Sequence, residues 1–95
     1  GGQHLSAIMF YSAVSAPSVA MIDTLKEIAP LYPEVRFFTV DVDRNTEITW
    51  KFRVSIVPTI MIFQRGQKLH EMITHKSVED LEALIDTFVT HAEQG

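Results

Sequence analysis

"IMFYSAVSAPSVAMIDTLKEIA", residues 8–29, decides the fold, because an apolar run leads through a turn of small residues directly into an amphipathic helix. The run from Leu5 to Tyr11 has the composition of a buried strand. Apolar residues then recur at helical spacing from Val19 to Ala29, and two prolines stop the pattern. Ser15 is a favoured capping residue, and Pro17 suits a first helical turn. The stretch predicts a strand followed by a helix over residues 16–29.

The residues after this helix alternate between strand and helix patterns. Val35 to Val42 is rich in β-forming residues, and its alternate positions Phe38, Val40 and Val42 predict one fully buried face. Asn45 or Thr46 is then expected to cap a short helix that reaches about Phe52. A hairpin of strands 57–63 and 68–74 should follow, and Ser77 should cap the last helix. A βαβ unit followed by a hairpin predicts an α/β fold of order β-α-β-α-β-β-α, whose mixed four-stranded sheet has helices on both faces.

Composition bounds the classes of function. The 95 residues suit a single domain over residues 1–95, and the net charge of -4 with scattered Lys and Arg disfavours nucleic-acid binding. No apolar run approaches the roughly 20 residues of a membrane helix. The chain has no cysteine, which excludes disulfides, thiolate metal sites and thiol catalysis. No signal-peptide pattern opens it, but a removed presequence would leave no trace, so a cytoplasmic and an organellar location both stay open.

The other chemically interesting residues predict neither a metal site nor a cofactor. The histidines are too dispersed for a ligand pattern and are expected at the surface; they are His4, His70, His75 and His91. Asp41, Asp43 and Glu47 are expected to be solvated turn acids, because a calcium loop needs more ligands. Trp50 and Phe52 are expected to pack in the core, with an exposed recognition aromatic as the alternative for Trp50.

Two motifs resemble the thioredoxin family. "KFRVSIVPTIMIFQRG", residues 51–66, is similar to the family's K-Y-x-I-x-x-I-P-T-x-x-x-F-x-x-G, and "FYSAVSAPSVAM" lies where the family has an aromatic pair and W-C-G-P-C-K-M. The resemblance covers about Leu5 to Val89 and implies the thioredoxin fold in a minimal form. It also implies a cis peptide bond before Pro58 and a groove that binds protein clients. The groove residues would be Val14, Ala16, Pro17, Val57, Pro58 and Thr74.

The resemblance breaks at the residues that carry the family's chemistry. Ser15 and Ser18 stand at the two cysteine positions. Serine has no disulfide state and needs a general base to act as a nucleophile, so the chain as written is redox-inactive. Four supporting positions also differ: Met9 replaces a buried Asp, Thr39 its Lys partner, Val14 a Trp and Thr74 a flexible Gly.

Two functions from different classes stay open. In the first, the chain is a naturally cysteine-free module that binds protein partners beside Pro58 and performs no reaction. In the second, it is a Cys→Ser form of an atypical thioredoxin, a protein-disulfide reductase whose parent motif was C-A-P-C at residues 15–18. A hydrolase using Ser15 or Ser18 is disfavoured, because no base accompanies either serine in the sequence.

The resemblance also bears on strand 35–42. Typical thioredoxins have a strand and a helix before the position of Leu5, so strand 35–42 is expected to lie at a sheet edge. An exposed edge invites pairing with another chain. We therefore expect either a cover from the first few residues or self-association through strand 35–42.

Overall fold

The computed structural model describes residues 4–73 and 77–94 and has the expected order of elements. Strand β1 (Leu5–Tyr11) leads into helix α1 (Ala16–Ile28), which continues as the 3-10 turn η1 (Ala29–Leu31). The remaining elements are β2 (Val35–Asp41), α2 (Thr46–Lys51), β3 (Thr59–Gln64), β4 (Gln67–Ile73) and α3 (Val78–Gln94).

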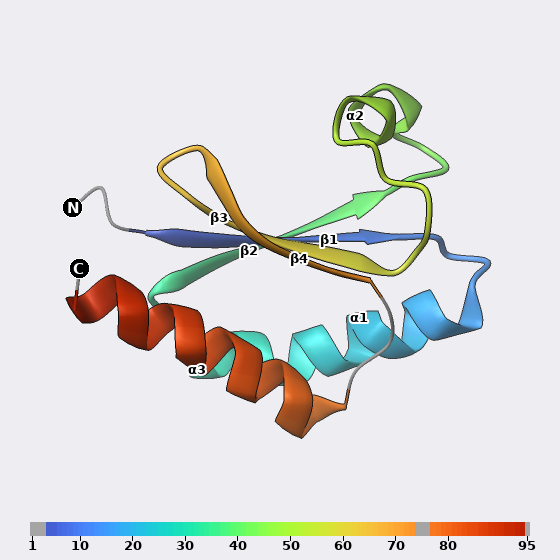
Figure 1. Ribbon diagram of the computed structural model, residues 1–95. Helices are drawn as coiled ribbons and strands as arrows, with labels where there is room; N and C mark the ends of the chain where they lie inside the picture. Colours follow the sequence, from blue (N-terminus) through green and yellow to red (C-terminus); the bar gives the residue numbers. More distant parts are fainter. Residues whose placement is uncertain (1–3, 74–76, 95) are drawn as a thin grey trace.

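The sheet is mixed and four-stranded, with the strand order β2-β1-β3-β4. β1 runs parallel to β2 and antiparallel to β3, and β3 pairs antiparallel with β4. α1 and α3 lie together against one face, whereas the short α2 stands at one end of the other face (Figure 1). The expected α/β architecture with helices on both faces is confirmed, but the two faces are covered very unequally.

The hydrophobic core lies between the sheet and the pair α1 and α3. Its buried members include Ala7 and Met9 from β1, Met21, Leu25 and Ile28 from α1, Ile60 and Ile62 from β3, and Leu81, Ile85 and Val89 from α3. Tyr32, which follows η1, donates its hydroxyl to Asp86 Oδ1 of α3 at 2.7 Å. Burial, the hydrogen bond to Asp86 and the charge of that carboxylate raise the pKa of Tyr32 to about 12.

The prediction that Phe38, Val40 and Val42 form a fully buried face of strand 35–42 is wrong. Val35 is buried and Phe37 packs against the core, whereas Phe38 is 50% exposed and Val40 is only half-buried. Successive side chains of a strand point to opposite faces, so residues 38 and 40 lie on the face away from α1 and α3. β2 is also an edge strand among the described residues, as expected.

Two smaller expectations for the helices and strands also need correction. α1 buries the stripe Ser18, Met21, Leu25 and Ile28, and Val19 lies outside it with 45% exposure. The α-helix ends at Ile28, with the following Pro30 in η1, and β3 begins at Thr59, directly after Pro58.

α2 differs most from its expectation. None of its six residues is buried, and Trp50 is 83% exposed, so the prediction that Trp50 packs in the core is wrong. Phe52, just beyond the helix, takes the inward position instead, with its ring 5.6 Å from that of Phe10 and 5.8 Å from that of Phe63. Asn45 is the N-cap residue, but its side chain does not cap; its amide donates to the Asp41 carbonyl.

Candidate functional site

The strand register assembles the candidate site at one end of the sheet. Phe10 of β1 pairs with Thr59 of β3, and Thr59 pairs with Ile73 of β4. Residues 12–18 therefore leave the sheet next to the place where residues 56–58 enter it (Figure 1). We call residues 12–18, residues 56–59 and Ile73 together the cis-proline end.

The segment before β3 has the conformation that the resemblance implied. The Val57–Pro58 peptide bond is cis, and Pro58 and Thr59 are buried. Thr59 Oγ1 donates to the Ile56 carbonyl oxygen at 2.6 Å. This part-buried hydrogen bond links Ile56 to Thr59 across the cis peptide bond, just before the start of β3.

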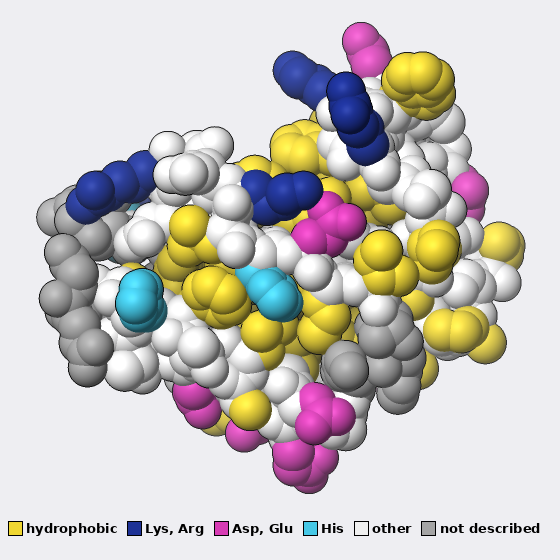
Figure 2. All heavy atoms as spheres, in the orientation of Figure 1, with side chains coloured by type: hydrophobic (Ala, Val, Ile, Leu, Met, Phe, Trp, Pro, Cys, Tyr) yellow, Lys and Arg dark blue, Asp and Glu magenta, His cyan; other side chains and the backbone are white. Residues whose placement is uncertain are grey.

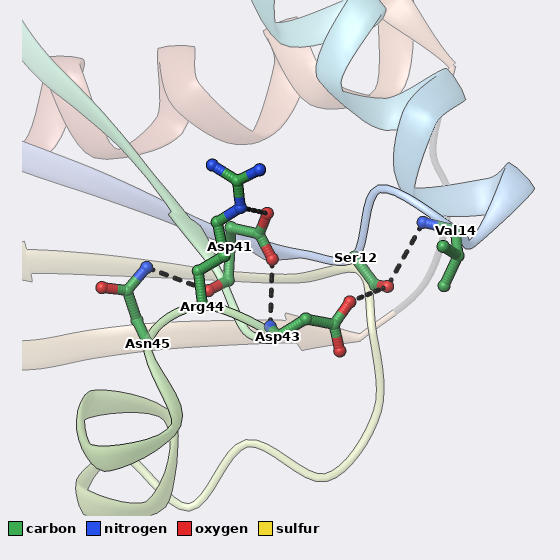
Figure 3. Close-up of polar contacts among 6 residues, drawn as sticks. All are labelled: Ser12, Val14, Asp41, Asp43, Arg44 and Asn45. Atoms are coloured by element: carbon green, nitrogen blue, oxygen red, sulfur yellow. Dashed lines mark hydrogen bonds and ion pairs between the residues drawn. The ribbon is translucent and has the colours of Figure 1, made fainter.

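The turn between β1 and α1 is held by a residue that the sequence interpretation missed. Ser12 is 6% exposed, and its hydroxyl donates to Asp43 Oδ2 at 2.6 Å (Figure 3). The Val14 amide donates to Ser12 Oγ at 3.4 Å, and the Asp43 amide donates to Asp41 Oδ1 at 3.0 Å. Asp41 and Asp43 are thus structural acceptors as well as solvated acids. They join the segment after β2 to the turn after β1.

The two serines at the family's cysteine positions occupy different environments. Ser15 is the N-cap of α1, and its Oγ accepts a hydrogen bond from the Ser18 amide at 3.3 Å, as its capping prediction requires. Ser18 is 0% exposed, and its Oγ has no hydrogen-bond partner among the described residues. Neither hydroxyl contacts a carboxylate or an imidazole in the part of the chain that the structure describes.

Apolar side chains are exposed around these buried groups. Val14 is 91% exposed, Ile56 55% and Ile73 45%. Ala16 and Pro17 are also exposed, whereas Val57 is half-buried; Thr74 lies outside the described residues. The residues of the cis-proline end are themselves uncharged, because residues 12–18, residues 56–59 and Ile73 contain no Asp, Glu, Lys, Arg or His. The carboxylate of Asp43, which accepts from Ser12, lies beside them.

The supporting positions lack the family's ion pair. Met9 is completely buried in the core, and Thr39 is its partner on β2 in the parallel register. The two strands thus bring these positions together, but a thioether and a hydroxyl cannot replace a carboxylate and an ammonium group. No acid lies at this position to assist proton transfer near residue 18.

The remaining candidates form no second polar centre. His4 and His91 are exposed, whereas His70 is half-buried with its ring 5.4 Å from that of Phe88; His75 lies outside the described residues. Among the described residues, no three His, Asp or Glu side chains are grouped as metal ligands. The described helices also include none with the length and apolar character needed to cross a membrane.

Comparisons with known proteins give consistent matches. The family model described as "Thioredoxin" matches residues 3–87. A thioredoxin of Alicyclobacillus acidocaldarius is 31% identical over 75 residues, which are 78% of this chain and 71% of that protein. Thioredoxin Asp f 28 of Aspergillus fumigatus is 28% identical over 76 residues, covering 80% of this chain and 70% of the relative. The X-ray structure of Fasciola hepatica thioredoxin has a TM-score of 0.84 at 24% identity, over 90% of this chain and 82% of that one.

Proposed function

Because this chain belongs to the thioredoxin family and has no cysteine, we propose that it binds protein partners at the cis-proline end without performing thiol chemistry. The partner would be an extended peptide segment that lies across Pro58, in contact with Val14 and Ile73. The family membership supports a peptide-binding role at this end of the sheet, and the serines at positions 15 and 18 remove the redox step.

The observation that carries the proposal is the exposure of three large aliphatic side chains around a buried cis proline. Val14, Ile56 and Ile73 are 91%, 55% and 45% exposed. Grouped exposed apolar residues are typical of interaction sites, whereas single ones need no explanation. The hydrogen bonds of Ser12 and Thr59 hold the backbone beneath this surface, which reduces the entropy lost when a partner binds.

A covalent reaction at the serines has no support in the geometry. Serine becomes a nucleophile when a general base accepts its proton. The Ser15 hydroxyl accepts a hydrogen bond from the Ser18 amide, and Ser18 Oγ is buried without a described partner. Both hydroxyls therefore act as structural groups, one as a helix cap and one as a buried side chain.

The test is a selection of cysteine-free random peptides displayed on phage, followed by affinity measurements with two variants. Val14→Asp places a charge on the apolar surface and should lower the affinity for the selected peptides roughly tenfold or more. Leu31→Asp is the matched control, because Leu31 is 61% exposed at the opposite end of the α1–η1 segment. Equal binding of the selected peptides to wild type and Val14→Asp would contradict the proposal.

The second candidate function, a Cys→Ser form of a protein-disulfide reductase, is favoured by one observation. Ser18 Oγ is fully buried and lacks a described hydrogen-bond partner, which is unfavourable for a hydroxyl. A thiol at this position would be favoured, because a buried cysteine behaves as a small apolar side chain. Position 15 gives no comparable reason to expect a cysteine, because the Ser15 hydroxyl makes a hydrogen bond that caps α1.

The double variant Ser15→Cys with Ser18→Cys tests this second candidate. If the parent was a reductase, the reduced variant should accelerate insulin reduction by dithiothreitol over the wild-type chain. A folded double variant without any acceleration would count against a redox parent. Cysteine codons at positions 15 and 18 of the encoding gene would establish it directly.

A further inference from the structure

A second surface lies on the segment around α2, which stands away from the sheet on the face opposite α1 and α3 (Figure 1). We call residues 44–55, which contain α2, the α2 lobe. A shallow hollow of about 440 Å³ opens on it, lined by Trp50, Arg53, Val54 and Ser55. Trp50 is 83% exposed, although an indole is among the most costly side chains to leave in water. The hollow therefore offers a large apolar surface without a partner in the described structure.

The backbone at the end of α2 builds this hollow. The Val54 amide donates to the Thr49 carbonyl at 3.1 Å, and the Arg53 amide donates to the Trp50 carbonyl at 3.0 Å. These two bonds form a Schellman motif, which turns the chain back so that Arg53 and Val54 lie beside Trp50. The hollow is thus a consequence of the helix end and not of loose side chains.

Arg53 occupies a backbone conformation that favours glycine. Its φ is 56°, in the left-handed region, at the position of the motif where glycine is usual. An arginine there is less favourable for folding than a glycine would be. The helix end accounts for this conformation, and what makes the guanidinium of Arg53 a candidate for a binding role is its exposed position beside Trp50 in the lining of the hollow.

The charges of the α2 lobe differ in sign from those of the whole chain. The lobe contains Arg44, Lys51 and Arg53 against the single acid Glu47, a net charge of +2, whereas the whole chain has a net charge of -4. Lys51 and Arg53 are exposed and make no ion pair within the described residues; Arg44 has a long contact of 3.9 Å with Asp41. Figure 2 shows Lys and Arg side chains beside a hydrophobic side chain on this lobe.

From these observations we propose that the hollow is a docking site for an acidic segment of a partner protein. An apolar side chain of the segment covers Trp50, and its carboxylates pair with Arg53 and Lys51. The lobe attracts such a segment electrostatically, while the acidic remainder of the chain repels it from other sites. A continuous polyanion such as a nucleic acid fits less well, because the cationic patch is small and the chain as a whole is acidic. The hollow shares no residue with the cis-proline end, although Ser55 directly precedes Ile56, and the proposal does not depend on the function proposed for that end.

The test uses Trp50 as its own reporter, because it is the one tryptophan in the chain. The probe is a capped peptide Glu-Asp-Leu-Glu-Asp, compared with Gln-Asn-Leu-Gln-Asn, Lys-Arg-Leu-Lys-Arg and a short oligothymidylate. The acidic peptide should shift the Trp50 emission to shorter wavelength and bind roughly tenfold more tightly than the neutral one, with an affinity that falls as salt rises. No shift, equal binding of the neutral peptide, or tighter binding of the oligothymidylate would overturn the proposal.

Two glycine variants provide a matched pair that controls for folding. Arg53→Gly removes the guanidinium and also relieves the left-handed backbone, so its thermal midpoint should not fall while its affinity for the acidic peptide falls at least fivefold. Arg65→Gly removes the same charge from another left-handed residue, with φ 54° in the β3–β4 turn, and should bind as wild type does. Equal affinities of the two variants would overturn the proposal. A concentration-dependent emission shift of the chain alone, with dimers in sedimentation, would assign the hollow to a second copy instead.

Discussion

The cis-proline end and the α2 lobe both expose large apolar side chains, but the molecule holds them in different ways. At the cis-proline end, Val14 and Ile73 lie over a buried framework that includes Thr59, and the residues of this end carry no charge of their own. On the α2 lobe, no residue of the helix is buried, and cations flank Trp50. The difference shows that exposed apolar residues can belong to a rigid neutral surface or to a protruding charged one. The two surfaces therefore call for different partners.

The largest expected effect compares one isoleucine from each region. Ile60→Ala removes a side chain that is 2% exposed in β3 and should lower the free energy of unfolding by about 2–5 kcal/mol. Ile48→Ala makes the same change at a residue of α2 that is 44% exposed and should cost under about 1 kcal/mol. Urea unfolding measures both. Similar losses would mean that α2 contributes to the core as much as β3 does.

A pair of threonines sharpens the comparison at the level of single hydrogen bonds. Thr59 donates to the Ile56 carbonyl from a buried position, and Thr49 donates to the Asn45 carbonyl on α2. Thr59→Val removes this part-buried hydrogen bond and should cost about 1 kcal/mol. Thr49→Val, where water reaches the carbonyl, should change the free energy of unfolding by no more than about 0.5 kcal/mol. Urea unfolding measures both losses. A larger loss for Thr49→Val than for Thr59→Val would contradict a rigid framework at the cis-proline end.

A serine-to-cysteine pair predicts a gain in stability. Ser18→Cys replaces a buried hydroxyl that lacks a described partner, and it should raise the free energy of unfolding by about 1 kcal/mol under reducing conditions. Ser55→Cys, on the exposed lining of the α2 hollow, should leave it within about 0.5 kcal/mol of wild type. Destabilisation by Ser18→Cys would show that the Ser18 hydroxyl makes a stabilising hydrogen bond in solution.

The smallest effect at neutral pH concerns Tyr32, which ties the segment after η1 to α3. Its pKa of about 12 in the folded state exceeds its ordinary value of 10.0, so folding favours the protonated phenol. The stabilisation is complete below about pH 10 and is lost as pH rises toward about 12. Tyr32→Phe should therefore flatten the alkaline decline of the urea midpoint, whereas Trp50→Phe on the α2 lobe should leave the decline unchanged. An equally steep decline in Tyr32→Phe would contradict this role.

Local patterns were sufficient for the parts of the molecule that depend on neighbouring residues. The strand and capped helix around Ser15 were predicted from residue spacing and capping chemistry, and the hairpin from its turn glycine. The cis bond before Pro58 was predicted from the family resemblance, because proline alone allows both isomers.

The incorrect predictions share one physical cause. The spacing of apolar residues indicates a strand or helix, but it does not show whether another element packs against them and buries them. The periodicity around Phe38 correctly indicates a strand, but its outer face stays open because only the short α2 lies on that side. Trp50 and Phe52 were both expected in the core, but only Phe52 takes an inward position. The Ser12–Asp43 hydrogen bond joins residues 31 apart in sequence, a separation at which local spacing gives no signal.

The most direct measurement is an amide-shift titration of the 15N-labelled chain with a cysteine-free peptide from the phage selection. Binding at the cis-proline end predicts shift changes concentrated in residues 12–18, residues 56–59 and Ile73, without changes at the indole N–H of Trp50. Changes concentrated in the α2 lobe, or spread over the outer surface of α1 and α3, would contradict the central claim that the cis-proline end is the partner-binding surface.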